Sequence, residues 1–395
     1  MLNRLRWLTA RLNFKVILFS IIGIGLYYLL YIWRLGSLTP GLSPVEAAAA
    51  ADSAAIDQIV DNHLYAPHKI VQFGLQSVLG ISPLSLRLAS AIFIVIFIVY
   101  FYLLVIKWFG KLIGLTATVL LASLPWTIII ARDATPSVLL LAPIAVFGSY
   151  YWLARTSKRI TLAWLLLSVV VGLSLYIPGM LWIILVASLV GRKLIWFNLK
   201  RINKFVLTLS ILLFLLVGTP LAYGIWYNPD LLKQIALIPN DWPSLLDFVK
   251  NTGWSLAAFF LRAREHFQYL IGTIPILSVL ISVMVLFGVY AMNVSARQKL
   301  LLMASLAAFS IVTAGLNDSL IYLTLALPAL VVIAAAGLRF LFLEWQSIFP
   351  RNPIPKNFAY LLILSLALIH IIYGASYGLA AWPNTPETRS VYMIK

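Results

Sequence analysis

The sequence has no cysteine and few acidic residues, and both absences narrow the chemistry that the protein can perform. Without cysteine there is no disulfide, no thiolate metal site and no cysteine nucleophile. The four histidines are scattered and no HxxxH or HExxH spacing occurs, so neither a built-in metal centre nor another cofactor is expected. Carboxylates beside a phosphate could still hold a divalent ion.

Charge is scarce as well, because only 10% of the 395 residues are charged while 62% are hydrophobic. A soluble domain cannot bury that much apolar surface, and the apolar runs recur to the end of the chain, which excludes a lone signal peptide. The sequence therefore predicts an all-α polytopic membrane protein. Its net charge of +17 comes from short basic clusters between the apolar runs, so nucleic acid is not expected as a partner.

Apolar runs of about twenty residues, the length that spans a bilayer, indicate transmembrane helices. Nine such runs occupy residues 16–33, 84–106, 112–130, 135–153, 205–226, 269–291, 300–316, 319–338 and 357–379. The stretch 160–190 is long enough for two shorter helices that meet near Tyr176–Gly179, because proline and glycine favour a turn there. We therefore expect about eleven spans.

The basic residues predict the orientation of these spans. With the N-terminus in the cytoplasm, nineteen of the 29 bases fall on the inner side together with one acid, Glu344. The outer side then carries ten bases and eleven acids. This asymmetry predicts a cytoplasmic N-terminus and an outer C-terminus, and it places carboxylate chemistry on the outer face.

This topology divides the chain into three parts. Residues 1–226 form an N-terminal transmembrane module with a first outer loop at 34–83, residues 227–268 form a second outer loop, and residues 269–395 supply the C-terminal transmembrane helices. In the first loop, Ser43 and Pro44 predict an N-cap and a helix start before an alanine-rich stretch. Residues 68–80 predict an amphipathic helix along the membrane interface.

Four of the twelve acidic residues gather in the first outer loop, within positions 46–61. On one helix from Pro44, Glu46, Ser53 and Asp57 would lie within about 20° of one direction and Asp61 about 60° away. A carboxylate near apolar walls can have a raised pKa and act as a general base. These acidic residues therefore form either a solvated polar face or part of a catalytic site in which Glu46 and Asp57 act.

A second candidate is the turn that contains Arg132 and Asp133, expected between the third and fourth spans. Arg132 could lie at the membrane interface without a catalytic role, or it could bind a phosphate through its planar N–H donors. Asp133 could orient Arg132 or contact the acceptor substrate. Arg87 and Lys69 are further outer bases that could meet an anionic group. His68 is either an interfacial polar residue or part of the site.

The order of these elements resembles the N-terminal module of GT-C membrane glycosyltransferases of family 39, the protein O-mannosyltransferase and aminoarabinose-transferase group. The resemblance covers about 80 residues, from Tyr65 to Pro143. The matching motifs are Pro67-His68, Gly80-Ile81-Ser82, Arg87-Leu88-Ala89-Ser90, Trp108-Phe109-Gly110, Ser123-Leu124-Pro125-Trp126 and Arg132-Asp133-Ala134. A later stretch, Asp318 to Leu338, resembles the family's penultimate helix but lacks a basic residue before Tyr322.

The resemblance implies an inverting transfer of a sugar from a polyprenyl-phosphate donor to a lipid, glycan or protein acceptor at the outer face of a bacterial cytoplasmic membrane. Glu46, assisted by Asp57, would deprotonate the acceptor hydroxyl. The donor phosphate would meet Arg132, Arg87 and Lys69, and the acceptor or sugar would meet Asp133, His68 and Trp242. Interfacial anchoring is the alternative role for Trp242.

The sequence departs from the family at one important position. An Asp-Glu pair, whose Asp is the base, opens the first outer loop of the family, whereas this chain has Val45 and Glu46. A non-catalytic GT-C-like protein that binds a lipid-linked glycan or a partner is therefore an alternative. A transporter or flippase is a further alternative, but it would need ionisable residues inside the spans, which are nearly free of charge.

Overall fold

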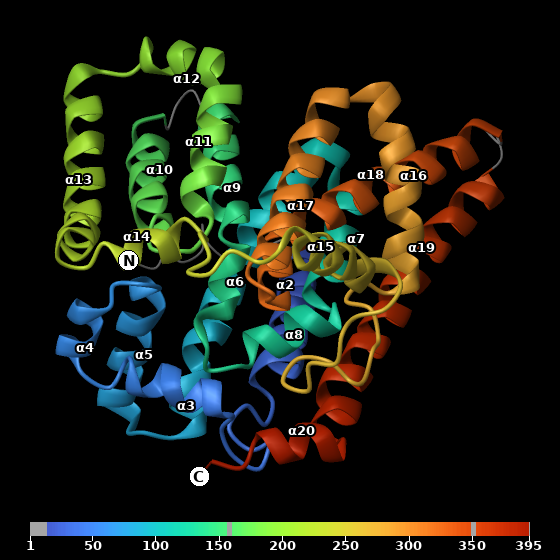
Figure 1. Cartoon of the computed structure of the whole chain (residues 1–395). Coiled ribbons are helices and arrows are strands. Elements are labelled where there is room, and N and C mark those ends of the chain that lie inside the picture. Colours follow the sequence, from blue (N-terminus) through green and yellow to red (C-terminus); the bar gives the residue numbers. More distant parts are fainter. Residues whose placement is uncertain (1–13, 156–159, 349–352, 395) are drawn as a thin grey trace, which may run out of the picture.

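The computed structural model describes residues 14–155, 160–348 and 353–394. Within these ranges the chain is built from helices and contains no β-strand (Figure 1). One isolated antiparallel bridge pairs Leu42, in the first outer loop, with Ile394 near the other end of the chain. The predicted all-α class is confirmed.

The first part of the chain supplies one apolar helix, three short loop helices and a set of packed spans. Its elements are α2 (Phe14–Tyr27), η1 (Tyr28–Ile32), α3 (Pro44–Ala51), α4 (Ile56–Asp61), α5 (Ala66–Leu79), α6 (Pro83–Phe109), α7 (Lys111–Ala122), α8 (Pro125–Ala131), η2 (Pro136–Leu141), α9 (Pro143–Arg155), α10 (Ile160–Ser174), α11 (Met180–Val190), α12 (Arg192–Leu199) and α13 (Lys204–Tyr227). The predicted turn between two helices at 176–179 is confirmed, with Gly179 at a φ of 80°.

The second part of the chain begins with two loop helices and ends in a short tail. Its elements are α14 (Asp230–Ile235), α15 (Leu245–Phe260), α16 (Val279–Ser295), α17 (Arg297–Leu316), η4 (Leu320–Ala326), α18 (Leu327–Ile348), α19 (Pro353–Ala375), η5 (Ser376–Ala381), η6 (Trp382–Asn384) and α20 (Pro386–Val391). The span predicted from residue 269 begins only at Val279, because residues 261–278 form a loop. Helices α9 to α13 form one group and α15 to α19 another (Figure 1).

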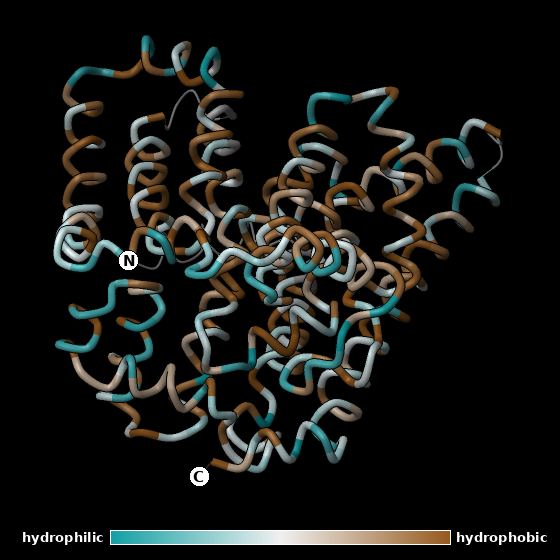
Figure 2. The backbone as a smooth tube through the Cα atoms, in the orientation of Figure 1, coloured by the Kyte–Doolittle hydropathy of each residue, from teal (hydrophilic) through white to brown (hydrophobic). Residues whose placement is uncertain are grey.

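Among the described residues, five helices are long and apolar enough to cross a membrane: Pro83–Phe109, Lys204–Tyr227, Arg297–Leu316, Leu320–Ile348 and Pro353–Asn384. The bent pair α7–α8 would be a sixth, and five shorter apolar helices accompany them. Hydrophobic residues dominate these helices, while hydrophilic ones gather around α4 and at helix ends (Figure 2). The chain is therefore a multi-pass integral membrane protein, and the total of eleven spans stays a prediction, as do the inward N-terminus and the three-part division.

The predicted single span over residues 112–130 is broken, and this break positions the site. Helices α7 and α8 meet at an angle of 61°. Pro125 causes the break, since it lacks an N–H group and disfavours helical geometry at Leu124, which is extended at φ −64° and ψ 128°. All seven residues of α8 are buried, so the turn after Ala131 lies inside the protein rather than at its surface.

The predicted acidic helix of the first outer loop is also corrected. Ser43 does cap α3, in a capping box with Glu46, but the helix ends at Ala51 and α4 starts afresh at Ile56. The angular relation expected between Glu46 and Asp57 therefore does not exist. Glu46 is fully buried, whereas Asp57 is exposed.

Helix α5 forms where the amphipathic helix was predicted, and its polar side faces the protein. His68, Lys69, Gln72 and Gln76 are buried along it, at helical spacing. Apolar residues on its other side are exposed, with Val78 at 82% and Ile70 at 58%. This arrangement suits a helix whose apolar face meets lipid while its polar face meets the outer loop.

Candidate functional site

Glu46 is at the centre of a buried polar network that joins three separate segments of the chain. Its Oε1 accepts hydrogen bonds from Arg87 Nε at 2.7 Å and from the Ala134 N–H at 2.9 Å. Its Oε2 accepts from Arg87 Nη2 at 2.8 Å and from the Ser43 N–H at 3.1 Å. A carboxylate has roughly four acceptor positions, so Glu46 has no position left for a substrate hydroxyl. This geometry argues against the predicted role of Glu46 as the general base.

Asp133 is the other buried carboxylate of the site, and it carries no ion pair among the described residues. Its Oδ1 accepts from the Thr135 N–H at 2.7 Å, and its Oδ2 accepts from Gln268 Nε2 at 3.1 Å and Tyr392 Oη at 3.4 Å. Burial and the negative charge of Glu46 raise the pKa of Asp133 to about 6. A carboxyl group with such a pKa can exchange a proton near neutral pH.

Arg132 lies in the same turn, but its two described hydrogen bonds go to backbone carbonyls and not to Asp133. Nη1 donates to the Leu30 carbonyl at 3.1 Å and Nη2 to the Trp33 carbonyl at 2.7 Å, where η1 ends. Burial and the nearby Arg87 lower the pKa of Arg132 to about 9, so it remains charged at neutral pH. Arg132 thus holds the first apolar helix against the site, and these two bonds use two of its five N–H donors.

Helix α5 contributes a lysine and a histidine with different surroundings. Lys69 Nζ donates to the Asn62 carbonyl at 3.0 Å and lies 3.3 Å from Asp52 Oδ2, whose side chain is 51% exposed. His68 is fully buried, with Nε2 2.9 Å from Ser90 Oγ. Burial lowers the pKa of His68 to about 3, which keeps the ring neutral.

Three residues that the sequence singles out are exposed and separate from this network. Asp57 is on α4, and Val45 is 52% exposed beside the buried Glu46. Trp242 lies in the loop between α14 and α15 and is 70% exposed. The structure thus brings Glu46, Arg87, Arg132 and Asp133 together and leaves Asp57 and Trp242 outside.

The tail of the chain closes the network from the other side. Leu42 and Ile394 exchange backbone hydrogen bonds of 2.7 and 3.1 Å. This bridge holds Tyr392, 1% exposed, so that its ring lies 5.7 Å from the Arg87 guanidinium carbon. Arg87 also donates to the Gly41 carbonyl at 2.8 Å, which ties the same loop to α6.

Sequence reasoning missed Gln72, Gln268 and Tyr392. Gln72 Nε2 donates to the carbonyls of Leu86 and Ala134, and therefore fastens α5 to the Arg132–Ala134 turn. A signal for Gln72 existed, since it follows His68 by four residues on the polar side of a predicted helix. Gln268 and Tyr392 had no such signal, because both lie more than 100 residues from Asp133 in the sequence.

The described residues contain no evident cluster of metal ligands. No group of three or more His, Asp or Glu side chains there is placed to hold an ion. The polar chemistry available is therefore a buried Glu–Arg pair, a separate carboxyl group with a raised pKa, and a half-solvated Lys–Asp pair.

No family model matches the sequence, and no curated protein matches it. Among solved structures, ArnT from Cupriavidus metallidurans in the apo state is similar, with a TM-score of 0.54 and 15% identity over 95% of this chain and 76% of that one. ArnT bound to undecaprenyl phosphate gives a TM-score of 0.55 and 13% identity over the same shares.

An oligosaccharyltransferase from Archaeoglobus fulgidus, tethered with an acceptor peptide, is similar as well. The TM-score is 0.53 and the identity 14%, over 95% of this chain and 58% of that one. At these identities the likeness concerns the fold, and it confirms the fold that the motifs of Tyr65 to Pro143 predicted. The chain has the GT-C fold.

Proposed function

We propose that this protein is a glycosyltransferase that moves a sugar from a polyprenyl-phosphate donor to an acceptor hydroxyl at the outer face of the membrane. The observation that carries the proposal is the buried cluster of Glu46, Arg87 and Asp133. Burying ionisable groups costs free energy, and such groups with a perturbed pKa concentrate at functional sites. The GT-C fold and the name of the similar undecaprenyl-phosphate complex support the donor class.

Asp133 is the residue best suited to be the base in this proposal. The acceptor oxygen would attack the anomeric carbon of the sugar, and the bond from that carbon to the phosphate oxygen would break. The acceptor proton would pass to Asp133, and polyprenyl phosphate would leave with the electron pair of the broken bond. One such displacement inverts the anomeric centre. Glu46 and Arg87 would hold the Asp133 turn, because Glu46 accepts the N–H of Ala134.

Lys69 is the proposed ligand of the donor phosphate. Its ammonium group faces the half-exposed Asp52 carboxylate, which a phosphate could replace without leaving a buried charge unpaired. Arg87 and Arg132 would add positive potential while keeping their carbonyl and carboxylate partners. The positive charges would favour the phosphate dianion that develops as the bond breaks.

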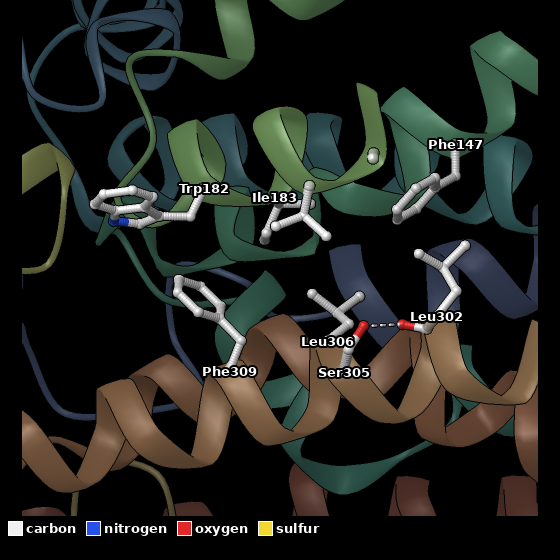
Figure 3. A pocket seen from close by; sticks show the side chains of 9 residues that line it. Phe147, Trp182, Ile183, Leu302, Ser305, Leu306 and Phe309 are labelled. Atoms are coloured by element: carbon white, nitrogen blue, oxygen red, sulfur yellow. Dashed lines mark hydrogen bonds between the residues drawn. The ribbon is translucent and has the colours of Figure 1, made fainter. Parts of the chain in front are cut away.

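A short segment of the donor's prenyl chain would lie in an apolar hollow between α11 and α17, whose volume of about 90 Å³ is too small for the whole chain. Phe147, Ile183, Leu306 and Phe309 face one another across it (Figure 3). The hydroxyl of Ser305 is satisfied by the Leu302 carbonyl at 2.9 Å, so it offers no unpaired polar group to the chain. Apolar walls between membrane helices suit an isoprenoid and exclude the sugar.

A transfer assay tests the proposal. Purified protein in nanodiscs would receive a panel of labelled polyprenyl-phosphate sugars and candidate acceptors, with wild type compared with Asp133→Asn, Lys69→Ala and the exposed control Lys233→Ala. We expect transfer by wild type and the control, and a loss of about 10²-fold or more in Asp133→Asn, as is typical when a general base is removed. Equal transfer by Asp133→Asn and wild type would overturn the assignment of the base.

A non-catalytic binding protein of the same fold is the second candidate, and Val45 favours it. Where the resemblance places a catalytic Asp, this chain exposes a valine, and the neighbouring Glu46 is fully engaged. Binding of undecaprenyl phosphate by wild type, without transfer from any donor in the panel, would select this candidate.

A further inference from the structure

A polar surface cavity, open to solvent, lies where the first outer loop meets the tail of the chain, separate from the residues proposed for transfer. It has a volume of about 280 Å³ and polar walls formed by Arg34, Ser37, Thr39, Asn384 and Arg389. The two arginines come from opposite ends of the sequence. Among the described residues that line the cavity, none is acidic.

The two guanidinium groups retain donors for a ligand. Arg34 makes one described hydrogen bond, a 3.5 Å contact from Nη2 to the Ser37 carbonyl. Arg389 donates from Nε to the Pro383 carbonyl at 3.3 Å and from Nη2 to Asn384 Oδ1 at 2.6 Å. Each guanidinium has five N–H donors, and neither group belongs to an ion pair among the described residues.

We propose that this cavity binds a phosphate group, held between Arg34 and Arg389. Both arginines line the same cavity and no carboxylate stands in its wall, so an anion between them would be attracted by both. The planar fork of arginine matches phosphate oxygens in a bidentate manner. The volume approaches the roughly 300 Å³ at which ligand pockets begin, which leaves room for the phosphate and part of the group esterified to it.

The position of the cavity indicates where the phosphate comes from. Arg34 follows the apolar helix α2–η1 by two residues, and Asn384 ends the apolar stretch Pro353–Asn384. The cavity therefore lies beside the ends of two apolar helices, where the predicted topology places lipid head groups. A phospholipid head group and free inorganic phosphate share the chemistry that these arginines recognise.

The competing explanation is that the arginines merely stabilise helix ends. Arg389 lies in the last turn of α20, where a cation interacts favourably with the helix dipole. That effect would not require both arginines to line one cavity with no acid in its wall. Stabilisation of a helix end would also not cause the protein to retain a phosphate selectively.

The test compares wild type with the double variant Arg34→Gln, Arg389→Gln. The matched control is Arg262→Gln, because Arg262 is an exposed arginine that does not line the cavity. Each protein is purified in phosphatidylcholine nanodiscs with and without phosphatidylglycerol, and retained lipid is counted by native mass spectrometry. Inorganic phosphate is titrated calorimetrically into the phosphatidylcholine samples. We expect about tenfold weaker binding, or more, for the double variant, since each charge-assisted contact typically exceeds the energy of a tenfold change.

Retention of phosphatidylglycerol alone would identify a head-group site, and calorimetric binding of phosphate would identify a small-anion site. Ser37→Glu provides a variant that keeps both arginines and places a negative charge in the wall, so it should also lose the anion while its thermal unfolding matches wild type. If the double variant and Ser37→Glu both bind phosphatidylglycerol and phosphate as wild type does, the proposal is overturned. These measurements need no sugar transfer, so their outcome is independent of the proposed activity.

Discussion

Glu46 and Arg87 form a bidentate ion pair in which neither side chain is more than 3% exposed, with N–O distances of 2.7 and 2.8 Å. The two residues lie 41 positions apart, so the pair fastens the first outer loop to α6. Both remaining acceptor positions of the carboxylate bind backbone N–H groups. A buried pair with every partner in place is costly to break from one side, because the residue left behind keeps an unpaired buried charge.

Breaking this pair should therefore destabilise the protein strongly. We expect Arg87→Leu to lower the free energy of unfolding by about 3–5 kcal/mol. The double variant Glu46→Met, Arg87→Leu should recover part of the loss, because it leaves no lone charge but still leaves the Ser43 and Ala134 N–H groups without an acceptor. Denaturant unfolding in detergent, followed by tryptophan fluorescence, measures both. The exposed pair of Lys233 and Asp230 is the control, and Lys233→Ala should unfold close to wild type. A double variant less stable than Arg87→Leu would contradict this account.

Asp133 should make the stability of the protein fall as pH rises. Burial and Glu46 raise its pKa from 3.8 to about 6 in the folded state, so the folded protein holds a proton that the unfolded chain has already lost in this interval. The folded state is therefore favoured most below pH 4, and that advantage disappears as pH rises through 6. The unfolding temperature of wild type, measured relative to that of Asp133→Asn, should fall between pH 4 and pH 6. Above pH 6 the difference between the two unfolding temperatures should stay constant. A difference that stays constant between pH 4 and pH 6 as well would contradict the prediction.

The sequence predicted the class of the fold well because that class depends on local patterns. Apolar runs of spanning length identify membrane helices wherever they occur, and the turn at Gly179 follows from proline and glycine. The sequence also predicted the helix N-cap at Ser43. The motif around Arg132 and Asp133 pointed to the region where the buried network is found.

The errors arose where tertiary contacts override local preference. Alanine-rich sequence predicted one helix from Pro44 to Asp61, but the chain leaves the helix at Asp52, and Ser53 turns inward to donate to Gln72 Oε1 at 2.8 Å. Pro125 bent a span that hydropathy alone presents as continuous. Neither pattern shows that Glu46 would meet Arg87 or that the tail would return to Leu42.

Gly41 should not tolerate a side chain, because the tail passes directly over it. A Cβ atom built there would overlap the carbonyl oxygen of Ile394, which is backbone and cannot rotate away. We expect Gly41→Ala to lower the free energy of unfolding by about 1–3 kcal/mol, as overpacking typically does. Gly74 in α5 has nothing within 4 Å of such an atom, so Gly74→Ala is the matched control and should stabilise by about 0.5–1 kcal/mol. Equal stability of the two variants would show that the tail does not rest on Gly41.

The hydroxyl of Tyr392 lies 3.4 Å from Asp133 Oδ2 and 3.4 Å from the Gln268 carbonyl, so its single proton is shared between two acceptors and should act only weakly on Asp133. Donation to an ionised carboxylate favours the charged form, so Tyr392→Phe should raise the pKa of Asp133 further and shift the stability loss to higher pH. Packing should change little, because phenylalanine keeps the ring that lies beside Arg87. The measurement is the pH dependence of the unfolding temperature in Tyr392→Phe, with Tyr360→Phe, a partly exposed tyrosine on α19, as the control. A midpoint that moves to lower pH in Tyr392→Phe, or moves equally in the control, would show that this hydroxyl does not act on Asp133.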